Sequence, residues 1–494
     1  MNLEIITGMY FYMLIMAILI YLGMRWEVHK NKYKNFYSLP SPTPNFPIFG
    51  NIILFKKLKY NIVKIFEYAM EKVGSPCLLY MPHRAYLTSS PEEFKIILNH
   101  PDALEKGAFY KVFNKTFGET LLLESVHPWK TNRKLLSKGF NQKVLNNFVA
   151  TFYNCSNRLV NKLKNNDDKD LAYLLHRYTW DNFTENFFEC KMNSLDDETN
   201  EFVDMILKGQ TTMGSRIGNI IKMNDFLYNF TEDGKYLDRI MKRAFAFIQG
   251  VVSKKRLEWS QEIDEEVFSK ELKRLPLLKL LISKEEIPDK YIREEMVLFA
   301  AAATDTTAYS IAYTCILLAL HPDIQEKVYK EVINIVGKDR EIDFTDLPLL
   351  KYTEMAINEA LRLLPVIPMI GRKSTADIDL GTRVIPANTD IICFIYGTHR
   401  NKKYWRDPKK YNPDRFLPEE VAKRPQCAFI PFSGGPRNCI GWKYAMIAMQ
   451  TTISNIVRHF HITTNYKSID DMDFESSIAM SPTHPLDCHF KIRK

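Results

Sequence analysis

The most informative segment of this sequence is Phe432-Ser433-Gly434-Gly435-Pro436-Arg437-Asn438-Cys439-Ile440-Gly441. Its glycines have no Cβ atom, so the backbone can wrap closely around a side chain. A cysteine thiolate needs backbone N–H groups or a nearby cation to hold its pKa down, and Cys439 follows directly on this turn. Arg437 can bind a carboxylate through charge-assisted hydrogen bonds. The segment therefore indicates a metal-binding thiolate, and a buried structural cysteine is the alternative.

Several shorter motifs accompany this segment. Glu359-Ala360-Leu361-Arg362 places an acid and a base on one helix face, and Pro413-Asp414-Arg415-Phe416 follows it downstream. Trp129-Lys130-Thr131-Asn132-Arg133 and Arg372 lie upstream of these two, and Ala302-Ala303-Thr304-Asp305-Thr306-Thr307 joins an acid to hydroxyl groups. Each motif is weak alone, because a pattern such as Glu-x-x-Arg arises by chance about once in a chain of this length.

In this order, the motifs resemble those of the cytochrome P-450 superfamily of haem-thiolate monooxygenases. Residues 432–441 match F-x-x-G-x-R-x-C-x-G at every fixed position. The overall pattern is most similar to insect-like, microsomal members of the clan that contains the fatty-acid ω-hydroxylases. The resemblance implies a mainly α fold with small β-sheets, in which a single large haem domain follows an N-terminal transmembrane helix.

The resemblance also implies roles for individual residues. Cys439 would be the axial thiolate ligand of the iron in haem b, and such a ligand favours O–O cleavage. Asp305 and Thr306 would relay protons to dioxygen. Glu359, Arg362 and Arg415 would form an ion-pair triad that fixes the fold behind the haem. The other cofactor-binding residues would be Phe432, Gly435 and Gly441 in the cysteine loop and Trp129, Arg133, Arg372 and Arg437 at the haem carboxylates.

Two alanines depart from the family's pattern. Ala303 stands where most members have glycine, which puts the size of the dioxygen groove in question. Ala302 stands where many members of the clan carry a glutamate that forms an ester with the haem. Because a methyl group cannot form that ester, we expect the haem to be extractable.

The longest predicted helix runs from Asp289 to Leu320. At the usual rise it would be about 48 Å long, enough to cross a whole domain. From Met296 to Leu320 its only charged residue is Asp305, so a second membrane span is the alternative. Hydroxyl groups near its middle favour a helix buried in protein. They can also bond back to the preceding turn, and a local distortion there would make room for dioxygen.

The rest of the body is predicted to be mostly helical, without internal repeats. Long amphipathic runs extend over Asn61 to Lys72, Asn132 to Lys164 and Asp323 to Val336. Strand-like runs are short, and the clearest are Cys77 to Thr88 and Asp379 to Phe394.

The N-terminal segment is predicted to cross a membrane once. Ile5 to Met24 carries no charge, and a helix of about 20 residues spans the roughly 30 Å hydrocarbon core of a bilayer. Basic residues follow it and only Glu4 precedes it, so the positive-inside rule places the remaining chain in the cytosol, at the endoplasmic reticulum membrane. A cleaved signal peptide is the alternative, but the segment lacks a basic start and a small-residue cleavage site.

These features divide the chain into three parts. Residues 1–24 form the anchor, residues 25–50 a basic and proline-rich connector, and residues 51–494 the haem-binding catalytic domain. Between Leu39 and Gly50 the connector has four prolines, which forbid a helix. We expect this connector to be stiff and to set the pose of the domain on the membrane.

Composition excludes several other classes of protein. Lys and Arg exceed Asp and Glu by 67 − 58 = 9 in 494 residues, which is too diluted to indicate nucleic-acid binding. The eight cysteines are scattered, with no Cys-x-x-Cys pair, so a reduced, cytosol-facing compartment fits best.

The electrons for oxygen activation are expected to come from a partner. The sequence has no Gly-x-Gly-x-x-Gly motif, so no dinucleotide site is indicated. Family members at this membrane use an NADPH-dependent flavin reductase and sometimes cytochrome b5. Electrostatic steering could bring their acidic faces to a basic surface, for which the candidates are Lys130, Arg133, Lys134, Lys138 and Lys443. A solvated basic surface without a partner is the alternative.

The substrate is expected to be lipophilic. The segments that face the haem in related enzymes are apolar here, which favours an apolar ligand. The clan suggests fatty acids, lipid-derived signals or foreign compounds. The candidate pocket residues are Phe109, Phe113, Phe117, Phe299, Val366, Ile367, Ile370 and Met480.

Three other functions remain open at this point. A haem-thiolate isomerase or dehydratase acting on a peroxide would not need the Asp305 and Thr306 relay or a reductase. A haem sensor would bind haem and oxidise no substrate. A membrane-anchored helical binding protein would have no haem at all.

The first prediction concerns Cys439. The reduced protein with carbon monoxide should show the red-shifted Soret band of a thiolate-ligated haem, and Cys439→Ala should remove it because the ligand sulfur is lost. Absorption spectra of the purified proteins test this. An unshifted band in the unsubstituted protein would refute thiolate ligation.

Overall fold

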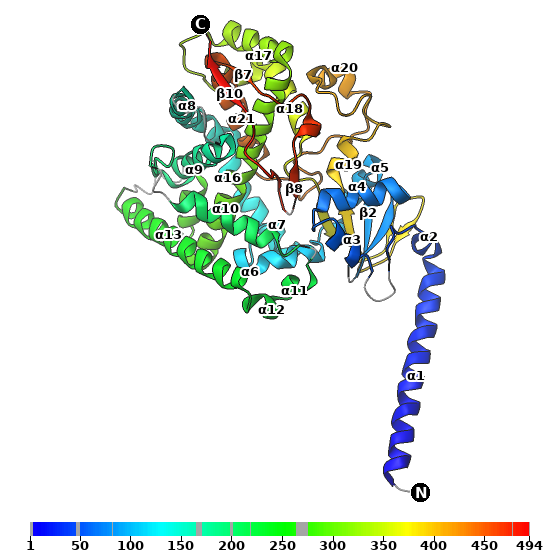
Figure 1. Cartoon of the computed structure of the whole chain (residues 1–494). Coiled ribbons are helices and arrows are strands. Elements are labelled where there is room, and N and C mark those ends of the chain that lie inside the picture. Colours follow the sequence, from blue (N-terminus) through cyan, green and yellow to red (C-terminus); the bar gives the residue numbers. More distant parts are fainter. Residues whose placement is uncertain are drawn as a thin grey trace.

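The computed structural model describes residues 3–45, 50–81, 83–164, 170–197, 201–217, 219–262, 275–476 and 478–493. Within these residues the protein is mainly α-helical with four small β-sheets, as predicted (Figure 1).

Helix α16 (Asp289–Leu320) runs through the middle of the body and has the bounds that the sequence predicts. Helices α9 (Leu171–Phe188), α13 (Glu232–Glu262) and α21 (Trp442–His459) pack against it, and most of its side chains beyond Met296 are buried. The alternative of a second membrane span is therefore wrong. The helix is α-helical over its full length, and the Thr306 hydroxyl bonds back to the preceding turn as predicted; a local distortion there stays a prediction.

The largest sheet has the strand order β1-β2-β6-β3. Strands β1 (Cys77–Met81) and β2 (His83–Thr88) form an antiparallel hairpin, β6 (Asp390–Cys393) runs parallel to β2, and β3 (Ile370–Lys373) runs antiparallel to β6. The register pairs Cys393 with both Thr88 and Ile370. Strand β3 thus holds Arg372 on a buried sheet.

The remaining sheets are two-stranded. They pair β4 (Ile378–Asp379) with β5 (Val384–Ile385), β7 (Phe460–Thr463) with β10 (His489–Ile492), and β8 (Phe474–Ser476) with β9 (Met480–Pro482). The run from Asp379 to Phe394, predicted to be strand-like, supplies parts of three separate strands.

The other helices cover these elements. The α-helices are α3 (Ile52–Lys57), α4 (Ile62–Val73), α5 (Pro91–Asn99), α6 (Asn114–Phe117), α7 (Val126–Leu136), α8 (Gln142–Lys164), α10 (Glu201–Gly214), α11 (Ile220–Met223), α12 (Asp225–Asn229), α15 (Leu277–Ile282), α17 (Pro322–Ile335), α18 (Lys351–Leu363), α19 (Ile395–His399) and α20 (Pro418–Val421). The 3₁₀ turns are η1 (Pro101–Ala103), η2 (Ala108–Phe113), η3 (Ser137–Phe140), η4 (Leu347–Leu349), η5 (Pro413–Phe416) and η6 (Ile469–Asp471).

One predicted helix is broken in the structure. The run from Asn132 to Lys164 divides into α7, η3 and α8. Asn141 causes the break, because its side-chain oxygen accepts the N–H groups of Lys143 and Val144 and so begins a new helix.

Helix α1 (Leu3–Lys32) projects from the body, and the short α2 (Lys34–Tyr37) joins it to the large sheet (Figure 1). The Tyr33 hydroxyl donates to the two carboxylate oxygens of Asp377 at 2.9 and 2.8 Å, and Phe36 packs on Tyr86 of β2 with 1% of its surface exposed. The chain is therefore fixed to the body before the proline-rich connector begins.

No helix within the described residues combines the length and the apolar character that crossing a membrane requires. The predicted anchor lies partly outside what is described, because the side chains of residues 1–12, 14, 19 and 22 are not among the described ones. In the proline-rich connector, residues 46–49 are likewise outside the described residues.

Candidate active site

The loop before α21 presents the sulfur of Cys439. The Cys439 N–H donates to the carbonyl oxygen of Phe432 at 2.9 Å, which closes the loop. Ser433 and Gly435 have φ values of +63° and +69°. A Cβ atom on Gly435 would lie 2.0 Å from the carbonyl oxygen of Leu98, so only glycine fits there. The tight turn leaves the Cys439 side chain exposed.

Gly441 differs from Gly435, because no steric clash within the protein requires glycine there. Its φ is −92°, which any residue adopts. A Cβ atom there would meet protein only at 3.8 Å, from Phe140. Neither the backbone nor a protein neighbour requires glycine at this position, which fits the expectation that a cofactor lies against it.

All eight cysteines are free, and Cys439 alone among them is exposed. It is therefore not held in a disulfide. Although the sulfur is accessible, desolvation by the surrounding protein raises the pKa of the Cys439 thiol, and the Gly441 N–H and the charge of Arg133 only partly oppose this shift. The loop N–H and the nearby cation both lower this pKa, as the sequence predicts, but desolvation outweighs them. A coordinated metal ion deprotonates a thiol outright, so iron would supply the missing positive charge.

Two buried arginines, Arg372 and Arg437, have N–H groups without partners. Arg372 is 1% exposed and donates to the carbonyl oxygen of Gly371, while its Nε and Nη2 have no partner. Arg437 is 6% exposed, lies 4.5 Å above the Trp129 ring, and donates to the carbonyl oxygen of Glu124. Its Nε and Nη1 have no partner. Burial and the charge of Arg372 lower the pKa of Arg437 to about 10.

A lysine that the sequence did not single out joins these arginines. Burial, followed by the charges of Arg372, Arg437 and Arg133, holds the pKa of Lys106 well below its usual range. Cations this close repel one another, and buried N–H groups without acceptors cost free energy. An anion with several oxygens would solve both problems, because its charge would offset the repulsion and its oxygens would accept the unpaired N–H groups. The two carboxylates of haem fit the cluster formed by Lys106, Arg372 and Arg437.

Arg133 does not join this cluster through hydrogen bonds. Its guanidinium donates to the carbonyl and side-chain oxygens of Asn438 at 2.9 and 2.8 Å. Arg133 thus braces the cysteine loop from α7, and its predicted contact with a haem carboxylate stays a prediction.

The structure brings the predicted triad together. Arg362 binds the carboxylate of Glu359 through two hydrogen bonds of 2.7 Å, and both side chains are fully buried. The Arg415 Nε donates to the same carboxylate at 3.2 Å. Arg362 also donates to the carbonyl oxygens of His399 and Pro408, so α18 is tied to the long loop that leads to Cys439.

On α16, the predicted relay residues have different partners. The Thr306 hydroxyl donates back to the carbonyl oxygen of Ala302 at 2.8 Å. Asp305 is 7% exposed, and one of its oxygens lies 3.0 Å from Nε2 of His176 on α9. No local pattern in the sequence marks His176, because it meets Asp305 only when the two helices pack.

Helix α16 also carries a buried carboxyl group, that of Glu295. Glu295 is fully buried and accepts the N–H of Leu121 at 2.6 Å. Burial raises its pKa to about 8, and the Leu121 N–H and Tyr291 only partly oppose this. Glu295 is therefore mostly protonated at neutral pH.

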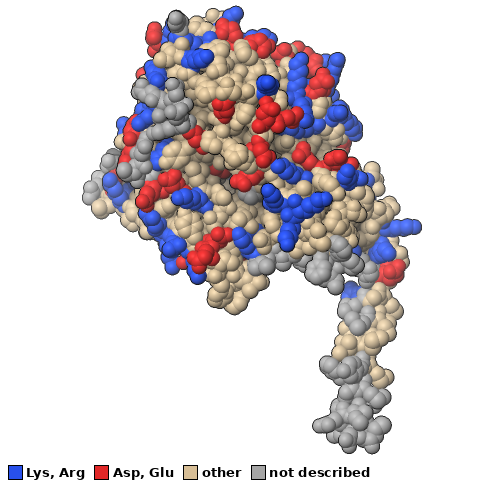
Figure 2. Space-filling view, in the orientation of Figure 1, with Lys and Arg blue, Asp and Glu red and all other residues tan. Residues whose placement is uncertain are grey.

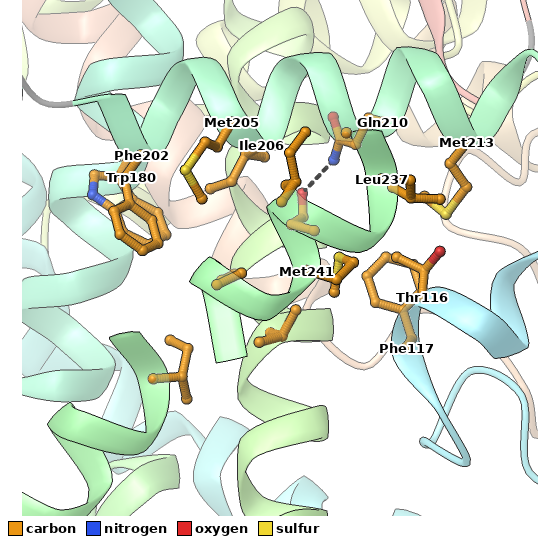
Figure 3. Close-up of a pocket in the computed structure, with 17 residues that line it drawn as sticks. Thr116, Phe117, Trp180, Phe202, Met205, Ile206, Gln210, Met213, Leu237 and Met241 are labelled. Atoms are coloured by element: carbon orange, nitrogen blue, oxygen red, sulfur yellow. Dashed lines mark hydrogen bonds between the residues drawn. The ribbon is translucent and has the colours of Figure 1, made fainter. Parts of the chain in front are cut away.

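An apolar pocket with a cavity volume of about 50 Å³ lies between α16, α10 and α13 (Figure 3). Its walls include Trp180, Phe202, Met205 and Met241. The one hydrogen bond drawn in Figure 3 is donated by Gln210 to the carbonyl oxygen of Ala301 at 3.0 Å.

The predicted pocket residues only partly coincide with this pocket. Of the eight, Phe117 lines it. Phe299 packs on Phe140, and the Met480 N–H donates to the carbonyl oxygen of Val366. The others lie elsewhere among the described residues: Phe109 stacks on Tyr110, Phe113 is buried in the main core, and Ile367 and Ile370 pack in the cluster around the large sheet.

An exposed thiol that iron can bind, together with buried cations that two carboxylates can neutralise, fits a site that holds haem through sulfur. The site is thus that of a haem-thiolate protein.

Comparison with known proteins gives the family. The chain belongs to the cytochrome P450 family, whose model matches residues 40–489. It is 28% identical to cytochrome P450 4c21 of Blattella germanica, over 95% of this chain and 96% of that protein. It is 32% identical to cytochrome P450 4c3 of Drosophila melanogaster, over 76% and 74%, and 26% identical to cytochrome P450 4V2 of Pongo abelii, over 95% and 93%. The predicted family is therefore confirmed, and the protein is a monooxygenase that binds haem through a cysteine thiolate.

The second prediction tests the loop. Gly435→Ala should abolish the red-shifted carbon monoxide band and lower the melting temperature, because its Cβ would collide with the carbonyl oxygen of Leu98. Gly381→Ala is the matched control, since Gly381 has a φ of +79° and nothing within 4 Å. It should cost only about 1 kcal/mol of backbone strain and keep the band. Equal effects of the two substitutions would contradict the account of Gly435.

The third prediction concerns Glu295. Its pKa is about 8 in the folded protein against 4.5 for a free side chain, so stability should fall as pH rises between these values, by up to roughly 1.4 kcal/mol per pH unit. Glu295→Gln keeps an acceptor for Leu121 and cannot ionise. The melting temperature of this variant relative to the unsubstituted protein should therefore rise between pH 5 and pH 8.

Exposed Glu285 provides the control for this measurement. Glu285→Gln should give no such trend. If the Glu295→Gln difference is constant over the same pH range, burial of this carboxyl does not govern the pH dependence.

Proposed function

We propose that this monooxygenase inserts one oxygen atom of dioxygen into a lipophilic substrate, with electrons from NADPH delivered by a flavin reductase. The observation that carries the proposal is the combination of an exposed Cys439 thiol with unpaired, buried N–H groups on Arg372 and Arg437. Residues 1–24 would be the anchor, residues 25–50 the connector, and residues 51–494 the catalytic domain.

Different residues would bind the iron and the carboxylates of the haem. Cys439 would bind the iron, while Arg372, Arg437, Lys106 and the indole N–H of Trp129 would hold the carboxylates. The haem would supply the site at which dioxygen is bound and reduced. Nothing at Ala302 can bind the haem covalently.

Protons would reach the oxygen site through α16. Asp305 would hold a proton in a buried position, and the Thr306 hydroxyl would pass it on after turning from the carbonyl oxygen of Ala302. A hydroxyl can accept and donate at once, so it can transfer a proton without a net change in charge.

The substrate class follows from the lining of the cavity. The pocket beside α16 is almost entirely apolar, so its ligand should be a hydrocarbon chain or ring. A fatty acid, a lipid-derived signal and a foreign compound all meet this requirement.

Electrons would arrive at the surface on the sulfur side of the site. Lys130, Lys134 and Lys138 are exposed on α7 and η3, and Lys443 is partly exposed at the start of α21. These side chains could attract the acidic face of the reductase or of cytochrome b5. On the face that Figure 2 shows, positive and negative side chains are interspersed over the body.

Two features support attachment to the endoplasmic reticulum membrane by a single span. On α1, described apolar side chains such as Met13, Met16 and Ile20 are more than half exposed. Helix α12 lies on the same side of the body as the free end of α1 (Figure 1). Phe226 and Phe230, at this helix, are 69% and 68% exposed. Both surfaces would be covered by lipid.

The fourth prediction tests the relay. Thr306→Ala should keep the red-shifted carbon monoxide band and raise the peroxide released per NADPH by roughly tenfold or more, because protons are delivered incorrectly. The measurement uses purified reductase, with dodecanoic acid as the probe lipid. Omitting reductase should stop NADPH-dependent oxidation, which separates a monooxygenase from a peroxide-consuming isomerase. Unchanged coupling in Thr306→Ala would show that this hydroxyl is outside the relay.

A further inference from the structure

His176 makes two hydrogen bonds that together determine where its protons are. Its Nδ1 lies 2.5 Å from the carbonyl oxygen of Ala172, one turn earlier on α9. A carbonyl oxygen can only accept, so Nδ1 carries a hydrogen. Its Nε2 lies 3.0 Å from a carboxylate oxygen of Asp305. The ring is 1% exposed, so water does not separate these groups.

The contact between His176 and Asp305 requires a proton. With the ring hydrogen on Nδ1, a neutral imidazole offers only a lone pair at Nε2, and a carboxylate oxygen also offers only lone pairs. Two acceptors at 3.0 Å would repel each other in a buried site. The pair therefore holds one additional proton, on Nε2 or on the carboxyl oxygen.

The surroundings keep this proton in place. The Tyr309 ring packs edge-on against His176 at 4.8 Å. Beside the pair, the Thr179 hydroxyl of α9 lies 2.9 Å from the carbonyl oxygen of Thr304, a separate contact between the same two helices.

The other titratable groups nearby are acids and phenols. Asp170 and Glu475 act on Tyr309, and Tyr313 lies one turn farther along α16. Burial, and next the charge of Asp305, raise the pKa of Tyr309 above its usual range. The phenols therefore stay neutral, and none of these groups supplies a competing cation.

We propose that His176 is the positioning residue of the relay: it holds Asp305 in α16 and stores the proton that Asp305 delivers. The inference rests on the proposed role of Asp305 and Thr306. In each delivery the pair loses one proton toward Thr306 and becomes neutral imidazole and carboxylate. It regains one proton from solvent water, and no electrons are exchanged at the pair.

Two substitutions separate the two proposed roles of His176, which are to hold Asp305 in position and to store a proton. In His176→Gln, the amide N–H can still donate to Asp305, but the side chain cannot take up a proton. In His176→Asn, the shorter amide can still bond to the carbonyl oxygen of Ala172 and cannot reach Asp305. Thr179→Val is the matched control, because it removes a hydrogen bond between the same helices without removing a titratable group.

The fifth prediction follows from these variants. With reductase and dodecanoic acid, His176→Gln and His176→Asn should each raise the peroxide released per NADPH by roughly tenfold and flatten its dependence on pH. Both should keep the red-shifted carbon monoxide band. Thr179→Val should release as much peroxide per NADPH as the unsubstituted protein does. If His176→Gln has unchanged coupling and an unchanged pH profile, His176 has only a structural role and the inference is overturned.

A second measurement does not depend on turnover. Solid-state spectra of protein labelled with ¹⁵N-histidine should show one ring that is absent in His176→Gln and shares its Nε2 proton with a carboxylate. In Asp305→Asn this signal should change to that of a neutral ring protonated at Nδ1. If the ring is already neutral, with no shared proton, in the unsubstituted protein, the stored proton does not exist.

The outcomes also distinguish this inference from the proposed relay. If Asp305→Asn and Thr306→Ala uncouple turnover while both His176 variants do not, the relay stands and the role of His176 fails. If none of the four substitutions changes coupling, the relay is absent and the inference is overturned with it.

Discussion

The structure depends on buried positive charge that the protein itself does not neutralise. Burial, and next the charge of Arg372, lower the pKa of both Lys106 and Arg437, and four side-chain nitrogen atoms of Arg372 and Arg437 are buried without acceptors. A fold that buries such groups loses stability until an anion binds. Haem binding and folding are therefore linked, because the cofactor's carboxylates stabilise only the folded chain. The fully buried Glu359 and Arg362 show the opposite solution, in which the protein supplies both charges.

Helix α16 separates the kinds of chemistry in the site. One surface contributes Ala302 and the Thr306 hydroxyl, and a second presents Ala300 and Ala301 to the apolar pocket. A third surface is bonded to α9 through Asp305 and Thr304. A single straight helix can serve these purposes because neighbouring residues point about 100° apart. The Thr306 hydroxyl and the apolar pocket are thus on different sides of the helix, and the proposed relay joins the Thr306 side to the side that is bonded to α9 through Asp305.

The sequence was informative where function depends on neighbours along the chain. The cysteine loop, the bounds of α16 and the pairing of Glu359 with Arg362 all follow from local spacing. The break at Asn141 was missed because the hydrophobic pattern continues through it. His176 and Lys106 were missed because their partners lie on other elements. The pocket beside α10 and α13 was missed for the same reason, since only packing brings Trp180 and Met241 together.

The attachment of α1 has a mechanical consequence. Tyr33 and Phe36 dock on the body upstream of the prolines, so the proline-rich segment is not a hinge between anchor and catalytic domain. The C-terminal end of α1 is instead held, through α2, against the sheet that includes β3. In the membrane attachment proposed above, a change in the tilt of α1, such as a thinner or thicker bilayer would impose, would be transmitted to that sheet, and so toward the strand that carries Arg372.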